Sequence, residues 1–147
     1  MHYYDYNRIL SYNCPVNVLI GERGVGKSYG AKNYVINQYR KKESQFLYLR
    51  RYENELKSVF EKDKNNQKDF FSDIRNAFSD ITLEAKQRKF FYNDNVFGFA
   101  KRMTASQDLK SGTYENIKTI IFDEYFIEKN KRYYLPNERY AFTFNFW

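Results

Sequence analysis

The pattern of apolar and polar positions predicts strands that alternate with helices. Short apolar runs occur at Val16 to Ile20 (VNVLI), at Gln45 to Leu49 (QFLYL) and at Thr119 to Phe122 (TIIF). Apolar runs of this length that stop at polar or glycine-rich segments are typical of buried parallel strands. The pattern therefore favours an α/β layered fold with a largely parallel sheet.

Helical periodicity follows the first of these runs, over residues 27–42. Apolar and aromatic residues recur there at steps of three and four, which places them on one helix face: Ala31, Tyr34, Val35 and Tyr39. Three basic residues, Arg40 to Lys42, end the segment, where the helix dipole favours positive charge. We therefore predict an amphipathic helix from Lys27 to Lys42.

The middle of the chain is predicted to be less regular. Residues 53–79 are rich in charge and are expected to form two helical pieces with a break near residues 64–66. Runs at residues 81–85, 89–92 and 96–100 are separated by turn-prone residues, which predicts a small antiparallel meander. Residues 106–116 are polar and are expected to form a loop.

A glycine-rich segment joins the first predicted strand to the predicted helix. Residues 21–28 (GERGVGKS) fit the Walker A pattern of Gly, four residues and Gly-Lys-Ser/Thr. Glycines let the backbone curl so that N–H groups point at phosphate oxygens, and the following helix adds its positive dipole end. Lys27 is expected to reach the β- and γ-phosphates and Ser28 to bind Mg²⁺. The predicted nucleotide-binding residues are Gly21, Glu22, Arg23, Gly24, Val25, Gly26, Lys27 and Ser28.

Two carboxylates, Asp123 and Glu124, end the third predicted strand. Acidic residues often end strands, but behind a Walker A loop this pair fits a Walker B motif. Asp123 is expected to hold Mg²⁺, in part through a bound water. Glu124 is the candidate catalytic base that orients and deprotonates the attacking water. The pair favours ATP hydrolysis coupled to mechanical work, with Lys27 as the second candidate catalytic residue.

Other residues near these motifs have two interpretations each. Arg23 either contacts the γ-phosphate or a neighbouring subunit, or faces solvent. Arg50 and Arg51 either touch phosphate or DNA or pair with Glu53 and Glu55, and the pairing is the favoured interpretation. The N-terminal tyrosines could stack on an adenine, but core packing is expected for most of them: Tyr3, Tyr4, Tyr6 and Tyr12.

Composition narrows the function less than the motifs do. A length of 147 residues fits one domain, and a net charge of +7 allows an anionic partner, although AT-rich codons also inflate basicity and aromatic content. The single cysteine, Cys14, excludes an internal disulfide framework, and His2 alone cannot form a zinc site. No signal peptide and no run near the ~20 apolar residues of a membrane span is present. We expect a soluble, cytoplasmic protein.

The motifs resemble a known family, the genome-packaging (encapsidation) ATPases of small short-tailed phages of Gram-positive bacteria. The resemblance rests on Gly21 to Asn37 (GERGVGKSYGAKNYVIN), Gln45 to Leu56 (QFLYLRRYENEL) and Ser106 to Tyr125 (SQDLKSGTYENIKTIIFDEY). Residues 6–10 (YNRIL) and 134–138 (YLPNE) also look like the family. The resemblance implies a P-loop NTPase of the additional-strand (RecA-like) type.

It also implies a function: an ATP-hydrolysing motor subunit that drives double-stranded viral DNA into a preformed capsid. The implied cofactors are ATP and Mg²⁺, and the implied partners are double-stranded DNA, the portal of the procapsid and sister subunits in a homo-oligomeric ring. Some members use a packaging RNA. Lys110, by itself a solvated loop lysine, is implied to act in trans on a neighbouring subunit's nucleotide. The expected location is the host cytoplasm, at the procapsid portal.

The resemblance stops at about Glu138. Family members continue with a helix, a further core strand, an arginine that acts across the subunit interface and a nuclease-like C-terminal domain. Residues 140–147 (YAFTFNFW) instead alternate aromatics at a period of two, as a strand does. We expect a single P-loop ATPase domain over residues 1–147, ending in an improvised edge strand or in the tail of a truncated or frameshifted reading frame. Without the further strand, which lies between the two Walker strands, the sheet core would be incomplete and marginally stable.

Three functions therefore compete. The first is the packaging-motor ATPase. The second is a truncated nucleotide-binding module that docks on a portal or on sister subunits without efficient turnover. The third is another P-loop nucleic-acid ATPase, such as a helicase loader or a recombination factor.

Overall fold

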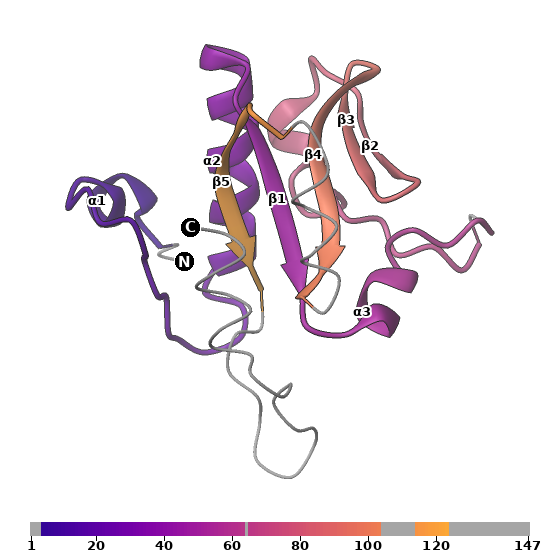
Figure 1. Ribbon diagram of the computed structural model, residues 1–147, viewed down its shortest axis with the longest axis horizontal. Coiled ribbons are helices and arrows are strands. Elements are labelled where there is room, and N and C mark those ends of the chain that lie inside the picture. Colours follow the sequence, from indigo (N-terminus) through magenta and orange to yellow (C-terminus); the bar gives the residue numbers. More distant parts are fainter. Residues whose placement is uncertain (1–3, 64, 104–113, 124–147) are drawn as a thin grey trace, which may run out of the picture.

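A computed structural model of the chain describes residues 4–63, 65–103 and 114–123. In chain order, its elements are α1 (Tyr6–Leu10), α2 (Lys27–Lys42), β1 (Gln45–Arg50), α3 (Glu53–Lys57), the 3-10 helix η1 (Arg75–Phe78), β2 (Leu83–Lys86), β3 (Lys89–Tyr92), β4 (Asn95–Arg102) and β5 (Ile117–Phe122). The strands form one sheet in the order β2-β3-β4-β1-β5 (Figure 1). The α/β class is confirmed.

The sheet is mixed rather than largely parallel. Strand β1 pairs in parallel with both β4 and β5, whereas β3 pairs in antiparallel fashion with both β2 and β4. The turns of this predicted meander place Gln87, Arg88, Asn93 and Asp94 at positive φ. Two-residue turns of that kind match the right-handed twist of the strands they join. The meander is confirmed, and β4 makes it part of the same sheet as β1.

Helix α2 has the predicted bounds and supplies the helical side of the core. It begins after Gly26, whose φ of 79° is left-handed, and it ends at Glu43, whose N–H bonds the carbonyl of Tyr39. Val35 and Ile36 are its buried residues, and Tyr39 packs against the core beside them. The predicted apolar face is therefore the face that packs, with Ile36 added to it.

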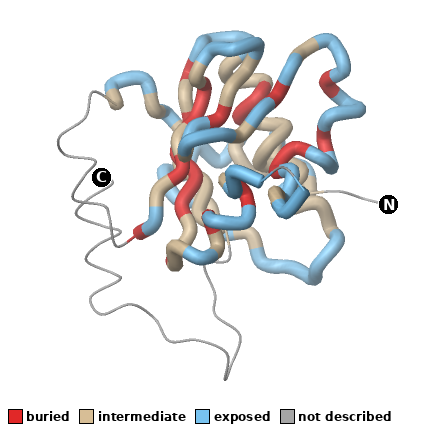
Figure 2. Tube along the Cα trace, turned by 90° about the vertical axis from the view of Figure 1, so that its right-hand side faces the viewer, coloured by how far each residue is buried: buried red, intermediate tan, exposed pale blue. Residues whose placement is uncertain are grey.

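The core between α2 and the sheet is largely aromatic. Phe46, Phe71, Phe90 and Phe97 are at most 1% exposed. Their rings pack in stacked and edge-on pairs, with centroids 5.1 Å apart for Phe46 and Phe90. Gly98 lies opposite Phe46 in the register, and a Cβ there would come within 2.3 Å of the Phe46 ring. Figure 2 shows the buried positions gathered inside the fold and the exposed ones along its loops.

Residues 53–79 form less helix than predicted. The structure contains only α3, with five residues, and η1, with four, while most of the remaining described residues form turns. Phe70, Phe71 and Ile74 are nevertheless buried, at 8%, 0% and 0% exposure. The segment buries apolar side chains without helical periodicity, so the charge pattern was a poor guide to its backbone.

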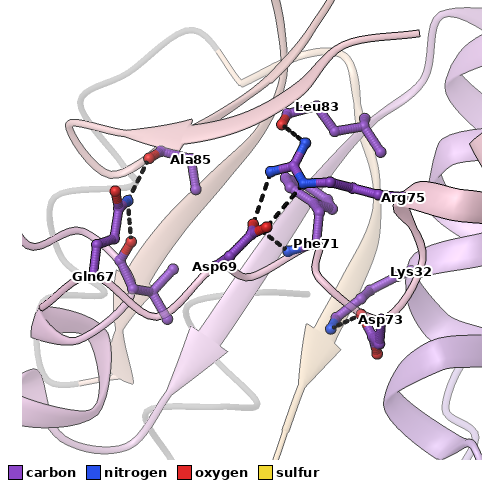
Figure 3. Close-up of polar contacts among 9 residues, drawn as sticks. Lys32, Gln67, Asp69, Phe71, Asp73, Arg75, Leu83 and Ala85 are labelled. Atoms are coloured by element: carbon purple, nitrogen blue, oxygen red, sulfur yellow. Dashed lines mark hydrogen bonds and ion pairs between the residues drawn. The ribbon is translucent and has the colours of Figure 1, made fainter. Parts of the chain in front are cut away.

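Side-chain hydrogen bonds replace the helical ones in this segment (Figure 3). Asp69 accepts two hydrogen bonds of 2.8 Å from the guanidinium of Arg75, which also donates to the carbonyl of Leu83. Gln67 donates to the carbonyls of Val59 and Ala85. A salt bridge of 2.8 Å between Lys32 and Asp73 then ties the segment to α2. These contacts satisfy polar groups that an irregular backbone would otherwise leave unpaired.

The prediction of a buried strand at residues 16–20 is wrong. The segment forms no strand, and Val16, Val18 and Ile20 are 50%, 59% and 70% exposed. A strand needs a partner for its N–H and C=O groups, and within the described ranges the sheet ends at β5. Among the described residues, the apolar run therefore lies outside both the sheet and the core. In the described part of the chain, no helix is long and apolar enough to span a bilayer.

Candidate nucleotide site

The loop before α2 adopts a conformation that only glycine takes readily. Gly24 and Gly26 have φ values of 85° and 79°, in the left-handed region. The first bond of α2 runs from the N–H of Gly30 to the carbonyl of Gly26, at 2.8 Å. Residues 21–24 are exposed, Arg23 among them, as is Ser28 in the first turn. The loop is thus exposed and is followed by an exposed hydroxyl at a helix N-terminus, a setting that suits an anion.

Lys27 places its positive charge inside this loop. Its Nζ donates hydrogen bonds of 2.6 Å to the carbonyl oxygens of Gly21 and Glu22. An ammonium has three donor hydrogens, so these two bonds leave one for a further acceptor. The loop therefore holds the amine close to its own backbone, with capacity for a phosphate oxygen.

The N-terminal segment braces the loop from outside. The Tyr4 hydroxyl donates to the carbonyl of Ile20, and the Tyr6 hydroxyl donates to the carbonyl of Lys27 at 2.6 Å. The Tyr6 ring also packs on Gly30, where a Cβ would come within 2.2 Å of the ring. Tyr12, in contrast, is 67% exposed. Of the predicted tyrosines, two contact the loop, one faces solvent, and Tyr3 lies outside the described residues.

Asp123 follows β5 and is held by two side chains of β1. Its Oδ2 accepts from the Tyr48 hydroxyl at 3.3 Å and lies 3.4 Å from Nη1 of Arg50. Tyr48 and Arg50 are alternate residues of a strand, so they point to the same face. Burial, followed by the charge of Asp123, raises the pKa of Tyr48 above its ordinary value.

Tyr6 bonds the loop and responds electrostatically to Asp123. Burial, followed by the charge of Asp123, raises the pKa of Tyr6 to about 12. The same hydroxyl bonds the carbonyl of Lys27, so Tyr6 lies directly beside the first residue of α2. In Figure 1, the loop before α2 and the C-terminal end of β5 likewise lie at the same end of the sheet. Segments about two thirds of the chain apart in sequence thus lie at the same end of the sheet.

The oxygen donors present fit a magnesium ion. Mg²⁺ prefers hard oxygen ligands and takes only one or two of them from the protein, with waters and substrate phosphates completing the shell. Asp123 has a carboxylate that is 35% exposed, and Ser28 has an exposed hydroxyl. Groups of three or more His, Cys, Asp or Glu that could form an all-protein metal site are absent from the described residues.

The structure shows which of the alternative contacts Arg50 and Arg51 make. Arg50 pairs with Glu55, with Nε and Oε2 3.5 Å apart, as favoured, but it also reaches Asp123. Arg51 is 4% exposed and lies over the Phe122 ring at 5.4 Å. Glu53, expected to pair with these arginines, contacts two others instead: Arg88 and Arg102. Glu124 and Lys110 lie outside the described residues.

Sequence reasoning missed the contribution of β1 to the site. Tyr48 was expected only as part of an apolar strand, and Arg50 was favoured as a partner of glutamates. A signal was present, because alternate residues at the end of a strand share a face with the end of the neighbouring strand. That signal needs the strand order, however, which places β1 directly beside β5. For Tyr6, no pattern in the sequence indicated a contact with Lys27.

Comparison with known proteins gives the chain its family context. A family model described as "Podovirus DNA encapsidation protein (Gp16)" matches residues 1–146. The DNA packaging proteins of Bacillus phages PZA and phi29 are each 39% identical to the chain over 136 residues. The match covers 92% of this chain and 39% of each relative, so the chain spans about two fifths of their length.

Solved structures agree with the sequence matches. The N-terminal domain of the DNA packaging ATPase from bacteriophage phi29 superposes with a TM-score of 0.84 at 38% identity, covering 95% of this chain and 68% of that one. A chain of the bacteriophage phi29 viral genome packaging motor assembly superposes with a TM-score of 0.82, also at 38% identity, covering 99% and 42%. The chain therefore belongs to the podovirus DNA encapsidation protein (Gp16) family.

Proposed function

We propose that the chain binds ATP with Mg²⁺ between its glycine-rich loop and Asp123, and that it hydrolyses ATP as the ATPase region of a viral DNA-packaging motor subunit. The observation that carries the proposal is that the glycine-rich loop and the C-terminal end of β5, after which Asp123 follows, lie at the same end of the sheet (Figure 1). The likeness to the N-terminal domain of the phi29 packaging ATPase supports the same conclusion.

Each residue of the loop has a defined role in this proposal. The loop backbone and the N-terminus of α2 bind the phosphates, with contributions from residues 21–26. Lys27 shares its third N–H with the β- and γ-phosphates and neutralises the charge that develops there. Ser28 and Asp123 would hold the magnesium ion, which would neutralise part of the phosphate charge.

Hydrolysis needs a base in addition to these binding groups. Glu124 follows Asp123 directly, and we assign to it the task of orienting the attacking water and accepting its proton. Lys110 is assigned a trans-acting role at the nucleotide of a neighbouring subunit. The proposed partners are double-stranded DNA, the portal of a procapsid and sister subunits in a ring, with a packaging RNA as a further candidate.

Nucleotide binding and phosphate release test the proposal. We would measure the affinity of this chain for a fluorescent ATP analogue with and without Mg²⁺, and then its phosphate release. Lys27→Ala should abolish Mg²⁺-dependent binding, because it removes the charge held at the loop. Glu124→Gln should keep binding and lower turnover by about 10²-fold or more. Lys41→Ala, an exposed lysine at the other end of α2, is the matched control. Equal binding by the Lys27 and Lys41 variants would refute the proposal.

A second candidate function is a nucleotide-binding module that docks on a portal or on sister subunits without efficient turnover. The observation that favours it is the exposure of three apolar side chains, Val16, Val18 and Ile20. They lie in the segment that leads into the glycine-rich loop, and this segment forms no strand. Steady-state phosphate release by the isolated chain separates the two functions. Multiple turnovers per chain support the motor ATPase, and tight binding without turnover supports the module.

A further inference from the structure

Asp123 already has a positively charged neighbour. Its Oδ2 lies 3.4 Å from Nη1 of Arg50, and the same oxygen accepts from the Tyr48 hydroxyl at 3.3 Å. The Arg50 side chain is only 12% exposed, so its charge is partly shielded from water. Charges in such a position interact more strongly than charges in bulk solvent. The carboxylate assigned to magnesium is therefore also half of an ion pair.

Glu55 holds the other side of this guanidinium. Its Oε2 lies 3.5 Å from Nε of Arg50, and the Glu55 side chain is 15% exposed. The same Oε2 accepts a hydrogen bond of 3.1 Å from the backbone N–H of Tyr52, which is the capping contact at the start of α3. Arg50 thus lies between two carboxylates, one at the end of β5 and one fixed to the first turn of α3.

A guanidinium and a divalent cation cannot both neutralise one carboxylate at full strength. Two cations close to the same oxygen repel one another, and each weakens the hold of the other. An arginine shared with a second carboxylate has an alternative partner, however. Movement of the guanidinium towards Glu55 relieves that repulsion without leaving a buried charge unpaired.

We propose that Arg50 is a positioning residue that competes with Mg²⁺ for Asp123, and that Glu55 sets the outcome by drawing the guanidinium towards α3. This inference rests on the proposed function, since it concerns the same carboxylate. It adds a regulatory link: the occupancy of the metal site is coupled to the start of α3 through one shared arginine. A contact that displaces α3 would change the magnesium affinity of the site.

Two substitutions test the competition because they have opposite expected signs. Arg50→Gln removes the competing charge, so the Mg²⁺ concentration at half-saturation should fall, by about threefold on the scale of partly exposed ion pairs. Glu55→Gln keeps the capping acceptor but weakens the hold on Arg50, so the Mg²⁺ concentration at half-saturation should rise by roughly twofold. The measurement is a Mg²⁺ titration of fluorescent ATP-analogue binding to the 147-residue chain.

The neighbouring strand and the same helix provide matched controls. Arg102 is the register partner of Arg50 on β4, and it pairs with Glu53 at 3.9 Å. Arg102→Gln and Glu53→Gln therefore make the same charge changes close by, while Arg50 and Glu55 keep their side chains. Both should leave the half-saturating Mg²⁺ concentration unchanged. A urea unfolding curve for each variant shows that the chains are folded.

The possible results distinguish a failure of this inference from a failure of the proposed function on which it rests. Tighter Mg²⁺ binding by Arg50→Gln with weaker binding by Glu55→Gln supports the competition, because an arginine that only supports the structure would not tighten metal binding when removed. Unchanged or weaker binding by Arg50→Gln overturns it, as do equal shifts in the controls. If Arg50→Gln does not fold, Glu55→Gln decides, and an affinity equal to that of Glu53→Gln overturns the inference. Wild-type chain without Mg²⁺-dependent nucleotide binding overturns the proposed function, and the inference with it.

Discussion

The hydroxyl of Tyr6 donates a hydrogen bond of 2.6 Å to the carbonyl oxygen of Lys27, the first residue of α2. The ring that carries this hydroxyl packs on Gly30, one turn further along the same helix. Helix α1 therefore fixes the start of α2, and with it the loop that delivers Lys27. Five residues near the chain start thus support the geometry of the candidate site.

Tyr6→Phe removes the hydrogen bond and keeps the ring. We expect it to lower the free energy of unfolding by roughly 1 kcal/mol, and to weaken binding of an ATP analogue. Urea unfolding and an ATP-analogue titration, each run beside wild type, measure these effects. Equal stability and equal affinity of the two chains would show that the contact is not part of the support.

The same variant tests the pH dependence. The pKa of Tyr6 is about 12 in the folded chain against 10.0 ordinarily. The folded chain therefore favours the neutral Tyr6 hydroxyl. The contribution of this hydroxyl to the free energy of unfolding is fully present below about pH 10 and is lost as the pH rises towards 12. The stability difference between wild type and Tyr6→Phe should shrink over that window. Urea midpoints measured from pH 8 to 12 check this, and a constant difference would contradict it.

Gly30→Ala should destabilise the chain even though alanine favours helix. A Cβ at this position would come within 2.2 Å of the Tyr6 ring, so α1 must shift, at a cost of about 1–3 kcal/mol. In a Tyr6→Ala background the space is free, and Gly30→Ala should instead stabilise by about 0.5–1 kcal/mol. Thermal unfolding of the four chains tests this change of sign. The same sign in both backgrounds would show that the ring is not the obstacle.

Phe90→Ala should destabilise the chain far more than Phe91→Ala. Phe90 is 0% exposed and its ring lies near several others, with centroids 5.1 Å from Phe46 and 4.6 Å from Phe70. Its removal leaves a cavity at a cost of about 3–5 kcal/mol. Phe91 is the next residue of β3 and is only half-buried, with Lys86 over its ring. Similar urea midpoints for the two variants would show that Phe90 contributes no more to the core than Phe91 does.

Arg75→Met should remove an acid-sensitive part of the stability. The two hydrogen bonds from Arg75 lower the pKa of Asp69 below its ordinary value of 3.8. The ionised carboxylate is favoured by folding, so its contribution is present above about pH 3.8 and is lost as pH falls below it. We expect a loss of roughly 1 kcal/mol at pH 7 that diminishes towards pH 2. An Arg75→Met chain whose deficit stays constant from pH 7 to pH 2 would contradict this.

Local features of the chain were predictable because neighbouring residues determine them. The helix from Lys27 to Lys42 has the predicted bounds, since its periodicity, its preceding glycine and its basic end all agree. The meander followed from short runs separated by turn residues, which the positive φ values at Asn93 and Asp94 confirm. The conformation of the glycine-rich loop likewise depends on its own glycines, whose left-handed backbone needs no distant contact.

The segments that were predicted wrongly depend on distant partners. Residues 16–20 have the composition of a buried strand, but a strand also needs neighbouring strands to pair with and apolar surface to cover it. Residues 53–79 were predicted to form two helical pieces, yet much of their described part forms turns, with hydrogen bonds from Gln67 and Arg75 to other parts of the chain. Neither the strand order nor these bonds can be read from the segment itself.

The sequence by itself determined the short-range parts of this protein: the apolar strands β1 and β5, helix α2, the hairpin turns, and a glycine loop followed far downstream by two acidic residues. Only the tertiary structure decided that β1 lies between β4 and β5, and that Tyr48 and Arg50 therefore reach Asp123. It also decided that Tyr6 bonds Lys27. The physical reason is that periodicity and turn chemistry act over a few residues, whereas strand order and side-chain contacts depend on how the whole chain packs.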